Sequence, residues 1–194
     1  MIELVDDVVR AGPYVVRLRR PKEAEVLIDE ARFDDDEFMP YWAELWPAGI
    51  ALAEAVAELD LRGARVVELG CGLAVPSIVA ALAGADALVT DWAPEALALA
   101  RENAAANGVV LRALEVDWAK PQPLLEQAPF DLVLCSDVLY EPRNVDALLA
   151  LLPALASEVL LGEPGRQTAA AFFERAERDW EITRAGQANR LRRR

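Results

Sequence analysis

Short apolar runs alternate with longer stretches of helical periodicity from residue 64 onward. The apolar runs are typical of buried strands and cover residues 66–69, 87–90, 109–116, 130–136 and 158–161. Apolar residues at helical spacing cover residues 75–83, 94–107, 145–156 and 167–179, and a loop or short helix is expected at residues 124–127. This alternation predicts strand–helix–strand units and a parallel sheet that is buried on both faces.

The two ends of the chain follow a different pattern. Residues 14–18 and 25–29 are expected to be extended, and residues 34–37 to form an acidic loop. Pro47 begins a further helical pattern, which ends at residues 60–63. At the C-terminal end, residues 180–184 and 189–193 predict a closing antiparallel hairpin. The second of these segments is short and basic for a last strand, which argues against its pairing.

Length and composition indicate one domain. The chain has 194 residues, of which 54% are hydrophobic and 27% are charged, enough to bury a full core. We therefore expect a single α/β domain over residues 1–194. The predicted architecture is a Rossmann-like, doubly wound, mostly parallel seven-stranded sheet with helices on both faces and a C-terminal antiparallel hairpin. Residues 46–194 would form this core, and residues 1–45 an N-terminal extension that caps the substrate side.

Charge and residue types exclude several functions. A net charge of −13 disfavours nucleic acid and anionic membranes as partners. The sequence has no histidine, which excludes Ser-His and Cys-His nucleophiles and imidazole-based zinc sites. Its two cysteines, Cys71 and Cys135, lack the spacing of a metal site and are expected to be small buried residues. No metal site is therefore expected. The N-terminus is acidic and does not resemble an export signal, so we expect a cytoplasmic protein.

Ligands of an open parallel sheet bind at the carboxyl ends of the strands, where this sequence places acids. The first strand leads into Glu68-Leu69-Gly70-Cys71-Gly72, a glycine turn that lets backbone amides approach a ligand closely. The second strand ends at Asp91, where a carboxylate can accept hydrogen bonds from both hydroxyls of a ribose. A ligand that contains a nucleoside is therefore expected.

Two nucleoside ligands compete for such a turn. The fingerprint for a nicotinamide dinucleotide requires glycine where this chain has Val75, and Glu68 would face the pyrophosphate with a negative charge. S-adenosylmethionine carries no phosphate and has a sulfonium and an ammonium group, for which a nearby acid is favourable. Glu68 therefore favours S-adenosylmethionine as the cofactor, with S-adenosylhomocysteine as the product.

The ends of the next two strands extend this interpretation. Asp117 and Trp118 follow the third strand, and can offer a carboxylate to the adenine amine and an indole to the adenine ring. Trp92, directly after Asp91, can cover the other side of the ring. The fourth strand leads into Asp137-Val138-Leu139-Tyr140, which puts a carboxylate and a phenol at the point where a methyl group would leave.

These four motifs, with Tyr41-Trp42-Ala43-Glu44-Leu45-Trp46-Pro47-Ala48-Gly49 upstream, resemble the seven-strand methyltransferases of the lysine methyltransferase group, methyltransferase family sixteen. The match covers roughly residues 41–166. Ala74 stands where the family loop often has a third glycine, an exchange that costs little if the backbone there is not left-handed. The resemblance implies functional roles for ten residues, eight of them at the strand ends and two in the upstream segment. Glu44 and Trp46 would pack against the cofactor, and Glu68, Gly70 and Gly72 would form the loop around its amino-acid part. Asp91 would bind the ribose, and Asp117 and Trp118 would lie at the adenine. Asp137 and Tyr140 would lie on the substrate side.

The resemblance also implies an activity, the N-methylation of a protein lysine by in-line transfer. Asp137 would hold the ammonium of the cofactor or orient the incoming amine, and Tyr140 would form one wall of the acceptor channel. Two alternatives are a small-molecule N- or O-methyltransferase on the same fold and a non-catalytic protein that binds the cofactor. The expected partner is a protein or a small amine, and the expected state is a monomer.

Overall fold

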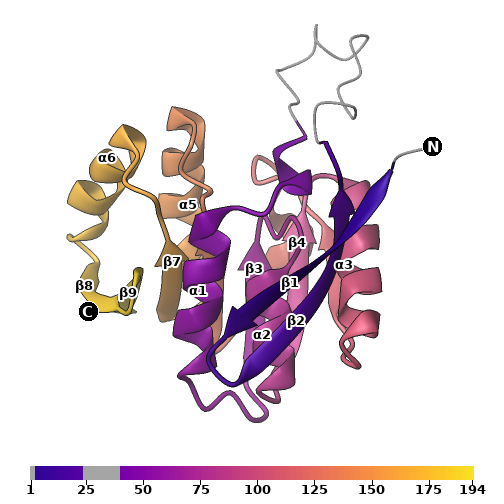
Figure 1. Ribbon diagram of the computed structural model, residues 1–194. Coiled ribbons are helices and arrows are strands. Elements are labelled where there is room, and N and C mark those ends of the chain that lie inside the picture. The colour runs from indigo at the N-terminus through magenta and orange to yellow at the C-terminus, as the bar shows by residue number, and fades with distance from the viewer. Residues whose placement is uncertain (1–2, 24–39) are drawn as a thin grey trace, which may run out of the picture.

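Five adjacent parallel strands and a C-terminal antiparallel hairpin form a seven-stranded sheet in the computed structural model, which describes residues 3–23 and 40–194 (Figure 1). The order across the sheet is β5-β4-β3-β6-β7-β9-β8. The parallel strands are β3 (Arg65–Leu69), β4 (Asp86–Asp91), β5 (Arg112–Glu115), β6 (Leu132–Ser136) and β7 (Glu158–Gly162). The strand order reverses between β3 and β6, which is where open sheets of this kind form a ligand crevice.

Helices cover both faces of the sheet, and this confirms the predicted α/β fold. Successive strand residues alternate between two cores, so that Val66 and Val89 belong to one and Val67 and Leu88 to the other. The first core lies under α1 (Pro47–Ala57), α2 (Val75–Leu82) and α3 (Pro94–Ala106). The second lies under α4 (Gln122–Leu125), α5 (Pro142–Leu155) and α6 (Gln167–Ala176).

Prolines determine where most of these helices begin. Each of α1 to α5 carries a proline at its first or second position, and α1, α3 and α5 begin with Pro47, Pro94 and Pro142. Proline lacks a backbone N–H, which the first helical turn does not use, and its φ angle already suits a helix. The helices therefore start directly after the loops at the strand ends, and this fixes the spacing between the strand-end residues and the helices.

The C-terminal hairpin forms and joins the sheet. It consists of β8 (Trp180–Ala185) and β9 (Ala188–Arg193), and β9 pairs antiparallel with β7. The expectation that the basic tail would not pair is wrong. Leu191 is fully buried, and the guanidinium groups of Arg190 and Arg192 form ion pairs with the Glu158 carboxylate on β7. These contacts compensate the positive charge of the strand.

An N-terminal hairpin packs on the helices α1, α2 and α3 and forms a separate two-stranded sheet (Figure 1). The hairpin consists of β1 (Leu4–Ala11) and β2 (Tyr14–Pro21). The sequence predicted the second strand but not the first, because the acids at residues 6 and 7 interrupt the apolar pattern of β1. The segments expected at residues 25–29 and 34–37 lie outside the described residues.

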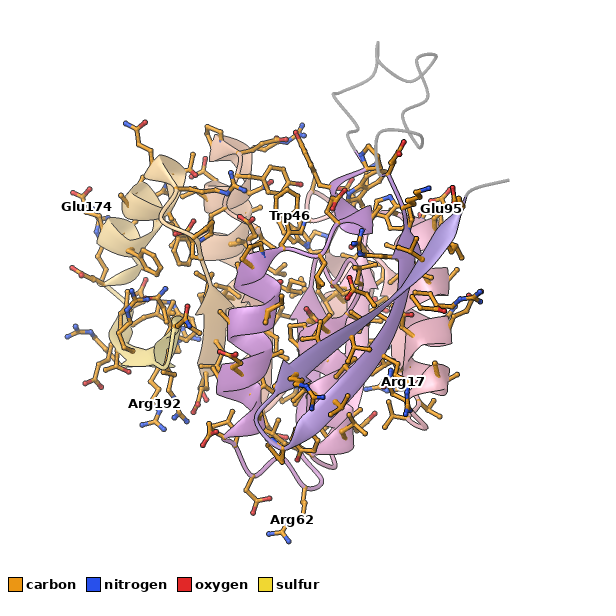
Figure 2. The ribbon with its side chains drawn as sticks, viewed as in Figure 1. Arg17, Trp46, Arg62, Glu95, Glu174 and Arg192 are labelled. Carbon is orange, nitrogen blue, oxygen red and sulfur yellow. The ribbon has the colours of Figure 1, made fainter. Side chains whose placement is uncertain are left out.

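Two asparagines, one in α3 and one at its C-terminal cap, hold the free edge of β2. Asn103 and Asn107 lie one helical turn apart, and each side-chain amide both accepts from and donates to the backbone of a β2 residue. Asn103 pairs in this way with Arg19 and Asn107 with Arg17, which Figure 2 places on the hairpin. The amides take the position of a neighbouring strand and satisfy the edge groups of β2.

Candidate functional site

The glycine loop after β3 lies in close contact with two other segments. Gly70 and Gly72 have φ angles of +63° and +48°, a left-handed conformation that glycine adopts readily. A Cβ atom added to Gly70 would lie 3.2 Å from Cγ1 of Val138, and one added to Gly72 would lie 3.0 Å from the carbonyl oxygen of Trp42. The loop therefore meets the segment after β6 and the segment before α1 with no space for a side chain.

Ala74 departs from the sequence-based expectation. The exchange of glycine for alanine was expected to cost little if the backbone was not left-handed, but the backbone is left-handed, with φ 59° and ψ 30°. A non-glycine residue in this conformation costs roughly 1 kcal/mol. The methyl group is buried in the core beneath α2, which offsets part of this cost.

Asp91 ties the end of β4 to the glycine loop. Its Oδ2 accepts the N–H of Gly72 at 3.0 Å, and its Oδ1 accepts the N–H of Ala93 at 3.0 Å. The side chain is almost completely buried, and this burial raises the pKa of the carboxyl, while the backbone hydrogen bonds oppose the rise. Each oxygen keeps a lone pair, so the carboxylate can still accept hydrogen bonds from two hydroxyls.

Glu68 lies beneath the loop and is fully buried. Its Oε2 accepts the N–H of Ser77 in α2 at 3.1 Å, while Oε1 and the Ser77 hydroxyl have no hydrogen-bond partner among the described residues. Burial raises the pKa of the Glu68 carboxyl to about 8, and the negative charge of Asp91 adds to this effect. Such a group gains from a nearby cation, because a positive charge favours its ionised form.

The residues expected at the adenine lie at the ends of β4 and β5. The six-membered ring of Trp118 lies 3.6 Å from the position of a Cβ atom on Gly70, so its indole flanks the glycine loop. Asp117 is exposed, and its Oδ1 accepts the N–H of Ala119 at 2.8 Å. Trp92 is partly exposed beside Asp91. The three side chains come from neighbouring strand ends, as the sequence predicted.

Asp137 is engaged by a residue that the sequence did not point to. Its carboxylate forms two hydrogen bonds with the guanidinium of Arg166, which lies between β7 and α6. The backbone of Asp137 is left-handed with φ 52°, a conformation that aspartate tolerates better than most residues. The next residue, Val138, has its carbonyl bound by the side-chain amide of Asn144 at 2.9 Å.

Tyr140 forms an aromatic cluster with the segment before α1. The ring centroids of Tyr140 and Tyr41 are 5.5 Å apart in an edge-to-face arrangement, and Tyr41 also contacts the ring of Trp46 at 6.2 Å. The Trp46 indole donates its N–H to the carbonyl of Tyr41 at 2.8 Å, and Figure 2 places Trp46 at the end of α1. Glu44 lies within the same segment and is half-buried.

Sequence reasoning missed three contributors to this region, namely Tyr41, the Trp42 backbone and Arg166. Arg166 could have been found, because Gly162 ends a fifth parallel strand and the residues after each strand are the ones that face the crevice. The two cysteines are buried as expected, and burial raises the pKa of both thiols. Among residues 3–23 and 40–194, no cluster of histidine, cysteine or acidic side chains has the geometry to hold a metal ion. In the same part of the chain, no helix combines the length and apolar character needed to cross a bilayer.

Two buried acids, Glu68 and Asp91, lie against the glycine loop and the helix that follows it. This set opposes the phosphates of a dinucleotide and fits a cation-bearing nucleoside such as S-adenosylmethionine. The unpartnered Oε1 of Glu68 and the left-handed glycines agree with a ligand held close to the loop backbone. Fold and site together define the class as that of the Rossmann-like methyltransferases.

Comparisons with known proteins identify the family. The lysine methyltransferase family matches residues 31–179, and the chain therefore belongs to this family. The histone-arginine methyltransferase METTL23 of Xenopus laevis is 33% identical over 56% of this chain and 49% of its own length. The protein N-lysine methyltransferase METTL21A of Danio rerio is 34% identical over 59% of this chain and 56% of its own. The chain thus spans about half the length of these curated relatives.

Solved structures agree on the fold. A 16S ribosomal RNA methyltransferase of T. thermophilus, in complex with AdoMet and guanosine, superimposes with a TM-score of 0.68 at 16% identity, covering 100% of this chain and 51% of the other. A ribosomal protein methylase of Lactobacillus delbrueckii subsp. bulgaricus gives a TM-score of 0.58 at 23% identity, over 76% of this chain and 79% of the other. Methyltransferases that act on different acceptors therefore share this architecture.

Proposed function

We propose that the chain transfers a methyl group from S-adenosylmethionine to the side-chain nitrogen of a protein lysine. The observation that carries this proposal is the pair of buried acids, Glu68 and Asp91, against a left-handed glycine loop at the switch point of the sheet. Membership of the lysine methyltransferase family supports both the cofactor and the acceptor class.

The chain's own residues would divide the cofactor between them. Gly70 and Gly72 would let the loop approach the amino-acid part closely, and the positive charge of the cofactor would lower the raised pKa of Glu68, so that its carboxylate becomes a counter-charge. Asp91, which already accepts the N–H of Gly72, would also accept hydrogen bonds from the ribose hydroxyls. Five further residues, all aromatic or acidic, would complete the contacts: Trp92, Asp117 and Trp118 around the adenine, and Glu44 with Trp46 on the side of α1.

The transfer itself needs alignment more than it needs a nucleophile from the protein. Bound S-adenosylmethionine would supply a methyl group that its sulfonium already activates. The protein's task is to align an acceptor lone pair with that carbon and to exclude water, a positioning effect that can supply several kcal/mol. Asp137 and Tyr140 are the catalytic residues in this proposal: Asp137 orients the acceptor nitrogen, and the Tyr140 ring, packed against Tyr41, forms a wall of the acceptor channel.

Two other acceptors compete with lysine in this proposal. Arginine is a second candidate, because the chain is 33% identical over 56% of its length to a protein named histone-arginine methyltransferase METTL23. A small amine is the third candidate, because the same strand-end chemistry would serve it. We propose that residues 1–194 form one methyltransferase domain that works as a monomer in the cytoplasm, with the segment around Tyr41 on the substrate side. The strongly acidic charge disfavours nucleic acid and anionic membranes as partners.

Two measurements test this function. Calorimetry should show binding of S-adenosylhomocysteine but not of NAD, and the reverse result would contradict the cofactor assignment. When the protein and methyl-labelled cofactor are added to a cell lysate, the label should then enter lysine side chains, which mass spectrometry of peptides identifies. Label in arginine or in the small-molecule fraction would assign the acceptor differently. Asp137→Ala should abolish incorporation, whereas Asp146→Ala, which removes an exposed carboxylate of α5, should not.

A further inference from the structure

The ion pair between Arg166 and Asp137 joins the ends of two neighbouring strands. Asp137 follows β6, and Arg166 lies beyond the end of β7, directly before α6. The Nε atom of Arg166 lies 2.6 Å from Oδ1 of Asp137, and Nη2 lies 2.9 Å from Oδ2. The Asp137 side chain is only 6% exposed. An ion pair in which a guanidinium binds both oxygens of a buried carboxylate is stronger and better oriented than an ordinary surface ion pair.

Backbone contacts hold both partners in position. The N–H of Asp137 donates to the carbonyl of Gly162 at 2.9 Å, which fixes the turn after β6 against β7. The N–H of Arg166 donates to both oxygens of the Glu163 carboxylate at 3.0 and 3.2 Å, and the N–H of Gly165 donates to the same carboxylate at 2.6 Å. The loop after β7 is thus folded so that the guanidinium points at Asp137, and the pair is preorganised.

This pair sets the charge on the substrate side of the crevice. Glu141, the carboxylate next to Tyr140, forms an ion pair with Arg143, so it is also compensated. Burial, together with nearby carboxylates, raises the pKa of Tyr140, and the phenol therefore stays neutral. Two tyrosine rings and two compensated carboxylates therefore lie at the edge that would receive an acceptor.

We propose that Arg166 is a positioning residue of this site, which neutralises Asp137 and fixes its orientation so that the acceptor is received as a neutral amine. This inference rests on the proposed function and specifies the form of its acceptor. A free Asp137 carboxylate would attract an ammonium, which has no lone pair to accept the methyl group. A compensated Asp137 can still accept a hydrogen bond from the N–H of a neutral amine, because its oxygens keep lone pairs.

The charge of Asp137 can be tested without knowing the acceptor. S-adenosylmethionine carries a positive sulfur and S-adenosylhomocysteine a neutral one, so the ratio of their Kd values reports the charge near the transfer point. In Arg166→Met, the uncompensated Asp137 should shift this ratio about tenfold in favour of S-adenosylmethionine, the order expected for one charge acting over several ångströms. Asp137→Asn combined with Arg166→Met should restore the wild-type ratio. Arg175→Met removes the exposed ion pair with Asp146 on the same helix and should leave the ratio unchanged.

Other outcomes distinguish this inference from the function on which it rests. If Arg166→Met weakens both ligands equally, Arg166 has only a structural role and the inference is overturned. If Arg166→Met does not fold, Arg166→Gln removes the charge while keeping a donor to Asp137, and should give the same shift. An unchanged ratio in that variant would overturn the inference as well. Wild-type protein that binds neither ligand would overturn the proposed function itself, and with it the role of Arg166.

Discussion

The side chain of Asn107 pairs with the backbone of Arg17 as a neighbouring β-strand would. Its Nδ2 donates to the Arg17 carbonyl at 2.7 Å, and its Oδ1 accepts the Arg17 N–H at 2.8 Å. Asn103, one turn earlier in α3, makes the equivalent pair with Arg19. A helix thereby closes the edge of a two-stranded sheet, and the N-terminal hairpin is fixed to the core that carries the glycine loop.

Removing these amides should loosen the hairpin. Asn103→Ala is expected to lower the free energy of unfolding by about 2 kcal/mol, and Asn107→Ala by about 1 kcal/mol. The loss is larger at Asn103 because this side chain is buried, so water cannot replace it as the partner of the Arg19 backbone. Chemical denaturation measures the loss, and amide hydrogen exchange should accelerate at residues 17 and 19. Glu102→Ala on the exposed face of the same helix is the control and should have little effect. Equal effects of all three changes would show that the amide pairs contribute nothing specific.

Glu68 should make stability depend on pH. The pKa of its carboxyl is about 8 in the folded protein, against an ordinary value of 4.5, so the folded state binds more protons between these two values. The contribution of Glu68 to stability is therefore fully present below about pH 4.5 and is lost as the pH rises through about 8. The Glu68→Gln side chain cannot ionise. Its free energy of unfolding, measured by denaturation from pH 5 to pH 8, should therefore change less with pH than that of the wild type, by on the order of a few kcal/mol. Glu115→Gln, at an exposed strand end, should keep the wild-type profile.

Asp91 should be needed for cofactor binding. In Asp91→Asn, one amide nitrogen replaces an acceptor oxygen, so an N–H of Gly72 or Ala93 loses its partner and the ribose loses a charged acceptor. We expect the Kd for S-adenosylhomocysteine to rise about 10- to 100-fold, which corresponds to roughly 1.4 to 3 kcal/mol. Calorimetry measures it. Asp86→Asn removes an exposed carboxylate at the other end of the same strand, and a similar loss there would argue against a site at the end of β4.

Gly72 should resist any side chain for two separable reasons. Gly72→Ala places a methyl group in a left-handed backbone, which costs about 1 kcal/mol, and brings it to 3.0 Å from the Trp42 carbonyl. Gly108→Ala has the same backbone cost at φ +73°, but nothing lies within 4 Å of its Cβ. Gly72→Ala should therefore destabilise the protein more than Gly108→Ala and should also weaken S-adenosylhomocysteine binding. Thermal unfolding with and without ligand checks both effects, and equal destabilisation would show that the loop and the Trp42 segment move apart freely.

The buried parallel sheet was predictable because its signals are local. Each central strand is apolar on both faces, and prolines mark the helix starts, so the order of the elements could be read without knowing how they pack. The exception was β1, where Asp6 and Asp7 hide the alternation. Their side chains pair with Arg19 and Arg20 of the partner strand, an interaction that only the hairpin reveals.

The sequence by itself determined the α/β architecture and the acids at the strand ends, since parallel strands bring their carboxyl ends to one edge whatever the rest of the chain does. Only the tertiary structure decided which groups meet there. Arg166 reaches Asp137 across 29 residues because β6 and β7 are neighbours, and Tyr41 reaches Tyr140 because the segment before α1 crosses the same edge. The raised pKa of Glu68 is likewise a property of the fold, because desolvation depends on what covers a side chain and not on its neighbours in sequence.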